Sequence, residues 1–146
     1  MTLQEYAAAA IEKSASDLIQ AVLTLPEDKR DWKPMDKGRS ALSQLAECAV
    51  INELFAQVAE TGVWSAERPV MSGRQVAALD TLDDAMEALR GGTAHLTAAV
   101  RGAADANLGD VIHLPWRTLT LAQVFLMPLW NMSYHEGQIN YIGTLL

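Results

Sequence analysis

Four stretches of the 146-residue chain place apolar side chains three and four residues apart, the spacing of one helix face. They cover about residues 2–25, 40–61, 80–101 and 120–146. Each helix must bury its apolar face against another helix. The pattern therefore predicts an all-α fold, a four-helix bundle that forms a single domain over residues 1–146.

Residues that start and stop helices support these boundaries. Thr2-x-x-Glu5 and Thr120-x-x-Gln123 are capping boxes, in which the first side chain caps the helix and the fourth reaches back to it. Ser40 is a good N-cap for the second helix. Between the first two helices, residues 26–39 (PEDKRDWKPMDKGR) are a charged connection that contains prolines and a glycine.

Three features should interrupt this regular pattern. Gly91 and Gly92 weaken the third helix by about 1 kcal/mol each relative to alanine, and a bend is expected there. Pro128 lacks a backbone N–H and should kink the last helix about one turn before Asn131. Residues 111–118 are expected to form a short hairpin.

Charge and composition exclude several classes of protein. Acidic residues outnumber basic ones by 18 to 11, which disfavours nucleic-acid binding. The strongest apolar run, from Leu121 to Trp130, is too short to span a bilayer, and the N-terminus lacks the features of a signal peptide. The lone Cys48 suits a reducing compartment. We expect a soluble, cytoplasmic protein with no nucleic-acid or membrane partner.

The last helix carries polar side chains where its buried face should be apolar. Asn131, His135 and Gln138 occupy the middle of a stripe that begins and ends with apolar residues. Burying such groups is costly unless each one finds a hydrogen-bond partner or a metal ion. The segment therefore marks either a functional site or a polar network in the core.

The second helix contains a comparable anomaly. Glu47 is the charged residue on a stripe that is otherwise apolar, and a carboxylate there needs a cation, a strong donor or a proton. His135 can supply the donor, and a divalent metal would satisfy both groups. Asn131 lies one turn before His135 and can face the same point. One imidazole, one carboxylate and one amide make a weak set for zinc, and harder ions suit it better.

The other polar residues near these positions receive more ordinary interpretations. Tyr141, one turn past Gln138, lines the same region, and a packing role is favoured over a hydrogen bond into the cluster. Cys48 is expected to be a small core residue. His95 and His113 are expected to be solvated or to lie in loops.

Two segments, DWKPMDKGRSALSQLAE and NMSYHEGQINYIGTLL, resemble the DinB-like (YfiT-like) helical bundles, and the resemblance covers nearly the whole chain. That family typically carries one metal-ligating histidine early in the second helix and two more, as H-x-x-x-H, on the last. By position the first falls on Glu47 and the second on Asn131, whereas the third is retained as His135.

The resemblance implies an up-down-down-up bundle with long crossover connections, frequently assembled as a homodimer. It implies a divalent metal (Ni, Zn or Mn) held by Glu47, Asn131 and His135, with Gln138 and Tyr141 lining the site. The corresponding function is that of a metal-dependent transferase or hydrolase acting on a small molecule, since the characterised relatives include metal-dependent transferases that use low-molecular-weight thiols. The residues assign no catalytic side chain and no substrate.

The alternative is a non-catalytic dimeric bundle, or a small-ligand-binding protein, whose polar site holds no metal. Glu47 then accepts a hydrogen bond from His135, while Asn131 and Gln138 complete a buried network. The sequence leaves both functions open.

Overall fold

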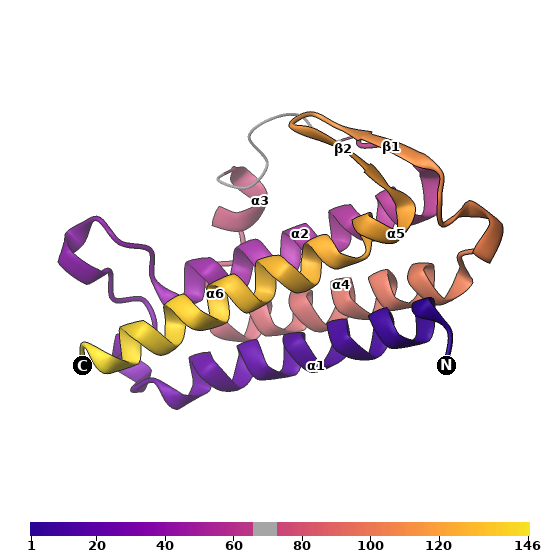
Figure 1. Cartoon of the computed structure of the whole chain (residues 1–146). Coiled ribbons are helices and arrows are strands. Elements are labelled where there is room, and N and C mark those ends of the chain that lie inside the picture. The colour runs from indigo at the N-terminus through magenta and orange to yellow at the C-terminus, as the bar shows by residue number, and fades with distance from the viewer. Residues whose placement is uncertain (66–72) are drawn as a thin grey trace.

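The computed structural model describes residues 1–65 and 73–146 (Figure 1). Four long helices dominate it: α1 (Leu3–Thr24), α2 (Ala41–Thr61), α4 (Leu82–Gly102) and α6 (Leu126–Thr144). The shorter elements are 3-10 turns at Glu27–Lys29, Pro34–Asp36 and Asp105–Asn107, helices α3 (Arg74–Ala77) and α5 (Leu121–Val124), and strands β1 (Val111–Leu114) and β2 (Arg117–Thr120).

The long helices form the expected bundle. Helices α1 and α6 run in one direction and α2 and α4 in the other, which confirms the up-down-down-up topology (Figure 1). Both α1 and α2 pack against α4 and against α6. Residues 62–81 connect the end of α2 with the start of α4 at the opposite end of the bundle. Glu47 on α2 and His135 on α6 thus belong to neighbouring antiparallel helices.

The predicted capping residues act as expected. Thr2 Oγ1 accepts from the Glu5 N–H at 3.1 Å, and the Glu5 carboxylate accepts from the Thr2 N–H at 2.8 Å. Ser40 caps α2 by accepting from the Ser43 N–H at 3.2 Å. Helix α2 ends at Gly62, whose φ of 71° is left-handed and favours glycine. These local contacts set where α1 begins and where α2, which carries Glu47, begins and ends.

The two glycines of α4 differ in role. The helix continues through both of them, and Gly91 is exposed. At Gly92 an added Cβ would lie 3.1 Å from the Ala49 carbonyl oxygen and 3.2 Å from the Glu53 backbone nitrogen, both on α2. Gly92 therefore lets the backbones of α2 and α4 approach closely, which offsets its low helix propensity.

The last helical segment is interrupted just upstream of its proline, within one turn of the predicted kink. The break between α5 and α6 falls at Phe125, about one turn before Pro128. Pro128 cannot donate to the carbonyl of Val124, four residues earlier, and its ring crowds that carbonyl. Downstream of the break, α6 is helical to Thr144 and carries the polar stripe.

The predicted hairpin is also present. Strands β1 and β2 are antiparallel, and their register pairs Val111 with Thr120, Ile112 with Leu119, His113 with Thr118 and Leu114 with Arg117. Ile112 and Leu114 point into the core. Trp116, in the turn, meets Trp64 edge to face with ring centroids 5.0 Å apart, and Trp64 meets Phe55 of α2 in the same way. The hairpin is thus packed on one end of the bundle.

The bundle interior is filled mainly by aliphatic side chains, together with Phe125 and Met132. In the part of the chain that the structure describes, no helix has the length and apolar character needed to cross a membrane. Its buried polar residues include Gln44 and Glu47 on α2 and Asn131 and His135 on α6, where these two helices face each other.

Candidate functional site

The structure brings Glu47 and His135 together. His135 Nε2 lies 3.2 Å from Glu47 Oε1, and the two residues are only 5% and 7% exposed. Glu47 projects from a stripe that is otherwise apolar and His135 from the polar middle of another, so each buried group needs a polar partner. The carboxylate and the imidazole anticipated from the sequence therefore share one interior point.

A third residue, Arg39, completes the charge pattern. Its Nη1 donates to Glu47 Oε2, and its Nη2 donates to the Ser43 carbonyl oxygen at 3.0 Å. Arg39 lies in the connection just before α2, two turns ahead of Glu47. Sequence reasoning missed this residue, although the need of a buried carboxylate for a cation was the signal that pointed to one.

Two glutamines hold the other side of the imidazole. His135 Nδ1 lies 2.8 Å from Gln44 Oε1 and 2.9 Å from Gln138 Oε1. Gln44 donates from Nε2 to the Arg39 carbonyl oxygen at 3.3 Å, which fixes the orientation of its amide. Nδ1 therefore acts as a donor, and the ring has a fixed direction. Gln44, buried on α2, is a second residue that the sequence did not single out.

The environment keeps Glu47 ionised. Burial raises the pKa of this carboxyl, but the hydrogen bonds from His135 and Arg39 lower it, and the pKa lies below its ordinary value. Burial also raises the pKa of the neighbouring Cys48 thiol, and the charge of Glu47 adds to this rise, so the net shift is upward. Cys48 is therefore a buried thiol and not a prepared nucleophile.

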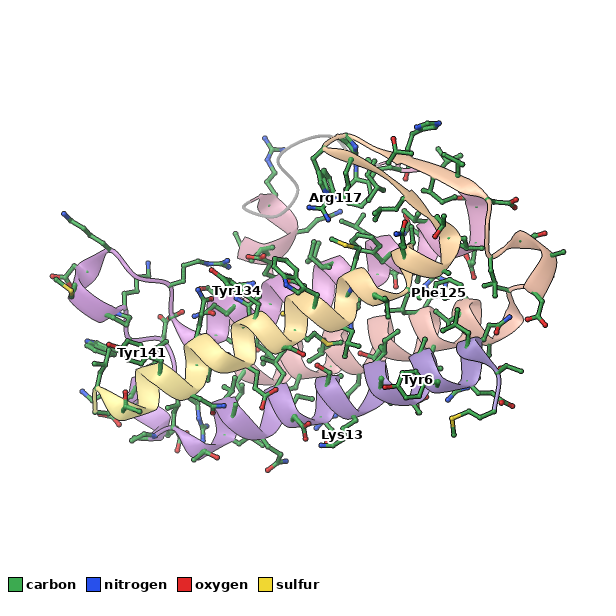
Figure 2. All side chains as sticks on the ribbon, in the orientation of Figure 1. Tyr6, Lys13, Arg117, Phe125, Tyr134 and Tyr141 are labelled. Carbon is green, nitrogen blue, oxygen red and sulfur yellow. The ribbon has the colours of Figure 1, made fainter. Side chains whose placement is uncertain are left out.

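Asn131 and Tyr141 stay apart from this cluster. Asn131 is buried one turn before His135, and its Oδ1 lies 4.0 Å from the Cys48 sulfur. Among the described residues it makes no hydrogen bond to Glu47 or His135. Tyr141 is 64% exposed and lies at the surface of α6 (Figure 2).

These contacts bear directly on the divalent metal that the resemblance implies. A metal ion needs several ligand lone pairs directed at one shared position. Glu47 instead accepts from Arg39 and faces His135, while the second nitrogen of His135 donates to an amide and Asn131 turns toward Cys48. In the described part of the chain no cluster of three or more His, Cys, Asp or Glu side chains could hold a metal. As arranged, the residues do not fit the ion.

A groove opens onto the same network. Its volume is about 570 Å³, and its lining residues are Pro34, Lys37, Gly38, Arg39, Gln44, Tyr134, Gly137, Gln138, Tyr141 and Ile142. Arg39, Gln44 and Gln138 belong both to the groove and to the buried network. A molecule in the groove would therefore contact the residues that hold His135 and Glu47.

The other two histidines lie elsewhere. His95 of α4 places Nδ1 3.0 Å from Glu53 and Nε2 3.1 Å from Glu60, both on α2. His113, on the exposed side of β1, lies 3.2 Å from the Thr118 hydroxyl. His95 is thus part of an ion cluster on the bundle surface, which spacing along one helix did not reveal.

Comparison with known proteins identifies relatives of this chain. A family model described as the DinB superfamily matches residues 10–139. None of the curated proteins compared with the sequence matches it.

Two solved structures share the fold. YfiT from Bacillus subtilis, described as a probable metal-dependent hydrolase with an unusual four-helix bundle topology, is 17% identical with a TM-score of 0.74 over 97% of this chain and 86% of that one. A mycothiol-dependent maleylpyruvate isomerase is 14% identical with a TM-score of 0.72, over 95% of this chain and 61% of that one. This chain thus spans less than two thirds of the isomerase, and at these identities the likeness shows the fold alone.

Proposed function

Since the chain belongs to the DinB superfamily, we propose that it is a small-molecule-binding member whose polar site works without a metal. The observation that carries this function is the contact of Arg39 with Glu47. A guanidinium supplies the positive charge that a buried carboxylate requires, and it takes the oxygen that a metal would use. The site is then complete with protein groups alone.

The groove beside this network has the properties of a ligand site. Small-molecule pockets usually measure about 300–1,000 Å³ and combine apolar walls with a few fixed polar groups. Here the walls include Tyr134, Tyr141 and Ile142, and the polar groups include Arg39 and Gln138. The hydrogen bonds of Arg39 and Gln138 within the network hold both side chains in place before a ligand arrives.

A competing function is that of a divalent-metal-dependent transferase or hydrolase, with Glu47, Asn131 and His135 as ligands to Ni, Zn or Mn. Two observations favour it: the short distance between Glu47 and His135, and the description of YfiT as a probable metal-dependent hydrolase. This function requires Arg39 to leave Glu47 and Asn131 to turn away from Cys48.

Metal titration separates the two functions. We expect the melting temperature of untagged protein to stay unchanged when Ni, Zn or Mn is added, because the described residues offer no free set of ligands to bind them. His135→Ala should lower the melting temperature equally with and without metal. A metal-dependent rise in the wild type that disappears in His135→Ala would support the metalloenzyme instead.

The homodimer and the cytoplasmic location remain predictions. Light scattering on purified protein tests the dimer, since a mass of twice 15.9 kDa is expected. Fractionation of the producing cells tests the location.

A further inference from the structure

We propose that the groove binds a small organic acid, with the carboxylate of the ligand at Lys37 and Arg39. A flat ring in the ligand lies against α6 between Tyr134 and Tyr141. This assignment rests on the proposed function and adds to it the chemical class of the ligand.

The charge of the groove is opposite to that of the whole chain. The protein carries a formal charge of −7, yet the groove is lined by two cationic side chains, Lys37 and Arg39, and by no acidic one. Among the described residues no carboxylate forms an ion pair with Lys37. An anion in the groove therefore meets a local attraction although the chain as a whole is acidic.

Contacts with other protein groups hold the Arg39 side chain in place. Two of its nitrogens are engaged, one by Glu47 and one by the Ser43 carbonyl oxygen. A guanidinium has five N–H donors, so donors remain for a ligand after these contacts are made. A planar carboxylate is the group that such donors recognise best, and a fixed guanidinium loses little freedom when it binds.

The helix wall provides a place for a ring. Tyr134, Gly137 and Tyr141 lie at i, i+3 and i+7 and so share one face of α6, and a Cβ added at Gly137 would meet no atom within 4 Å. The backbones of the two tyrosines are about 10 Å apart along the axis. Both tyrosines are on α6, with Tyr141 nearer the C-terminal end of the helix (Figure 2). The space over Gly137 thus suits a flat apolar body between two aromatic side chains.

The stacking of Tyr134 on Trp130 supports this position. Their rings are 5.5 Å apart with an interplanar angle of 20°. Because Trp130 restrains Tyr134, one wall of the groove is ordered before a ligand binds. Glu136, the acidic neighbour of Gly137, interacts electrostatically with Lys13 of α1 and does not line the groove.

Calorimetric titration with two matched probes tests the assignment. The probes are 1-naphthoate, which carries a carboxylate, and 1-naphthamide, which has the same ring without the charge. We expect the acid to bind at least about fivefold more tightly than the amide, since charge-assisted hydrogen bonds exceed neutral ones. Raising the salt concentration should weaken binding of the acid and leave that of the amide unchanged.

Three variants locate the binding. Gly137→Leu should abolish binding of both probes, because the new side chain fills the space over α6. Gly91→Leu is the matched control, since Gly91 is also helical with no atom within 4 Å of an added Cβ, lies on α4 and should leave binding unchanged. Lys37→Gln, at an exposed position, should weaken the acid about threefold and leave the amide unchanged.

The outcomes distinguish this assignment from the proposed function. If both probes bind equally well and both are lost in Gly137→Leu, the groove binds small molecules but the assignment of an acid is overturned. Binding of naphthoate that survives Gly137→Leu, or no binding at millimolar concentration, also overturns it. Failure of the metal-free site itself would appear instead as metal-dependent melting of the protein without any probe.

Discussion

Helix α2 presents carboxylates to a histidine on each of two neighbouring helices, and the contact of Glu47 with His135 differs from that of Glu53 with His95 in burial and in the surrounding charges. Glu47 meets His135 of α6 inside the bundle, where both residues are buried and Arg39 adds a guanidinium. Glu53 meets His95 of α4 at the surface, where the side chains are 45% and 35% exposed. The residue types are the same, so burial and the surrounding donors decide which contact forms a site.

The two contacts also respond to pH in opposite ways. Hydrogen bonding to Glu53 raises the pKa of His95, burial lowers it and Glu60 adds to the rise, so the pKa lies above 6.5. That contact stabilises the fold fully below pH 6.5 and loses its effect as pH rises through the raised value. The ionised Glu47, whose pKa is lowered in the folded protein, stabilises the fold fully above pH 4.5. This stabilisation is lost as pH falls through the lowered pKa.

The largest expected effect comes from removing the buried carboxylate. Glu47→Ala leaves Arg39 and His135 without their shared acceptor and should lower the free energy of unfolding by about 3 kcal/mol, the typical cost of breaking a buried pair. Urea denaturation measures this change. Glu53→Ala is the surface control, with an expected change of less than about 1 kcal/mol. Equal changes in the two variants would contradict the distinction between the two contacts.

A smaller effect should come from Arg39, whose side chain is partly solvated. In a double-mutant cycle of Arg39→Ala and Glu47→Gln, we expect a coupling free energy of about 1–2 kcal/mol. Additive effects of the two substitutions would mean that Arg39 does not hold Glu47 in solution. The same cycle on the exposed pair Lys13 and Asp17 should give about 0.3–0.5 kcal/mol.

The pH dependence sharpens the comparison further. The stability of the wild type should fall more steeply below pH 4.5 than that of Glu47→Gln. The wild type loses its ionised carboxylate as Glu47 is protonated, whereas the glutamine of the variant does not titrate. Chemical denaturation at a series of pH values from 3 to 7 measures the difference. Parallel curves would show that Glu47 has the same pKa in the folded and unfolded chains.

The smallest effect is expected at the surface. His95→Gln should destabilise the protein by less than about 0.5 kcal/mol, and only at a pH below the raised pKa of His95. The difference from the wild type should shrink in high salt, because exposed charges are screened. A loss at pH 6 that persists in 1 M salt would instead indicate a packing role for the ring.

The sequence predicted much of the fold because local chemistry determined it. Apolar spacing defined the four long helices, Ser40 and Gly62 bounded α2, and Pro128 placed the break before α6. Gly92 was interpreted only as a weak point, since its contact with the α2 backbone depends on another helix.

Less of the site could be predicted from the sequence, because part of it depends on contacts between separate segments of the chain. Glu47 and His135 stood out because each is a polar residue on an apolar stripe. Arg39 lies in a connection without periodicity, and nothing in its neighbours indicates that it turns back toward α2. The sequence also did not predict the direction of the Asn131 amide. Rotation about its side-chain bonds turns it toward Cys48 and not toward His135.

The location of Arg39 outside the helices has a consequence for how such proteins diversify. The bundle can form from its apolar faces alone, whereas Arg39 reaches Glu47 only if the connection between α1 and α2 folds correctly. Inserting or deleting a single residue between Pro34 and Ser40 would leave the scaffold intact and exchange the chemistry of its interior. Arg39, the counter-charge of Glu47, can thus be replaced while the four-helix bundle stays the same.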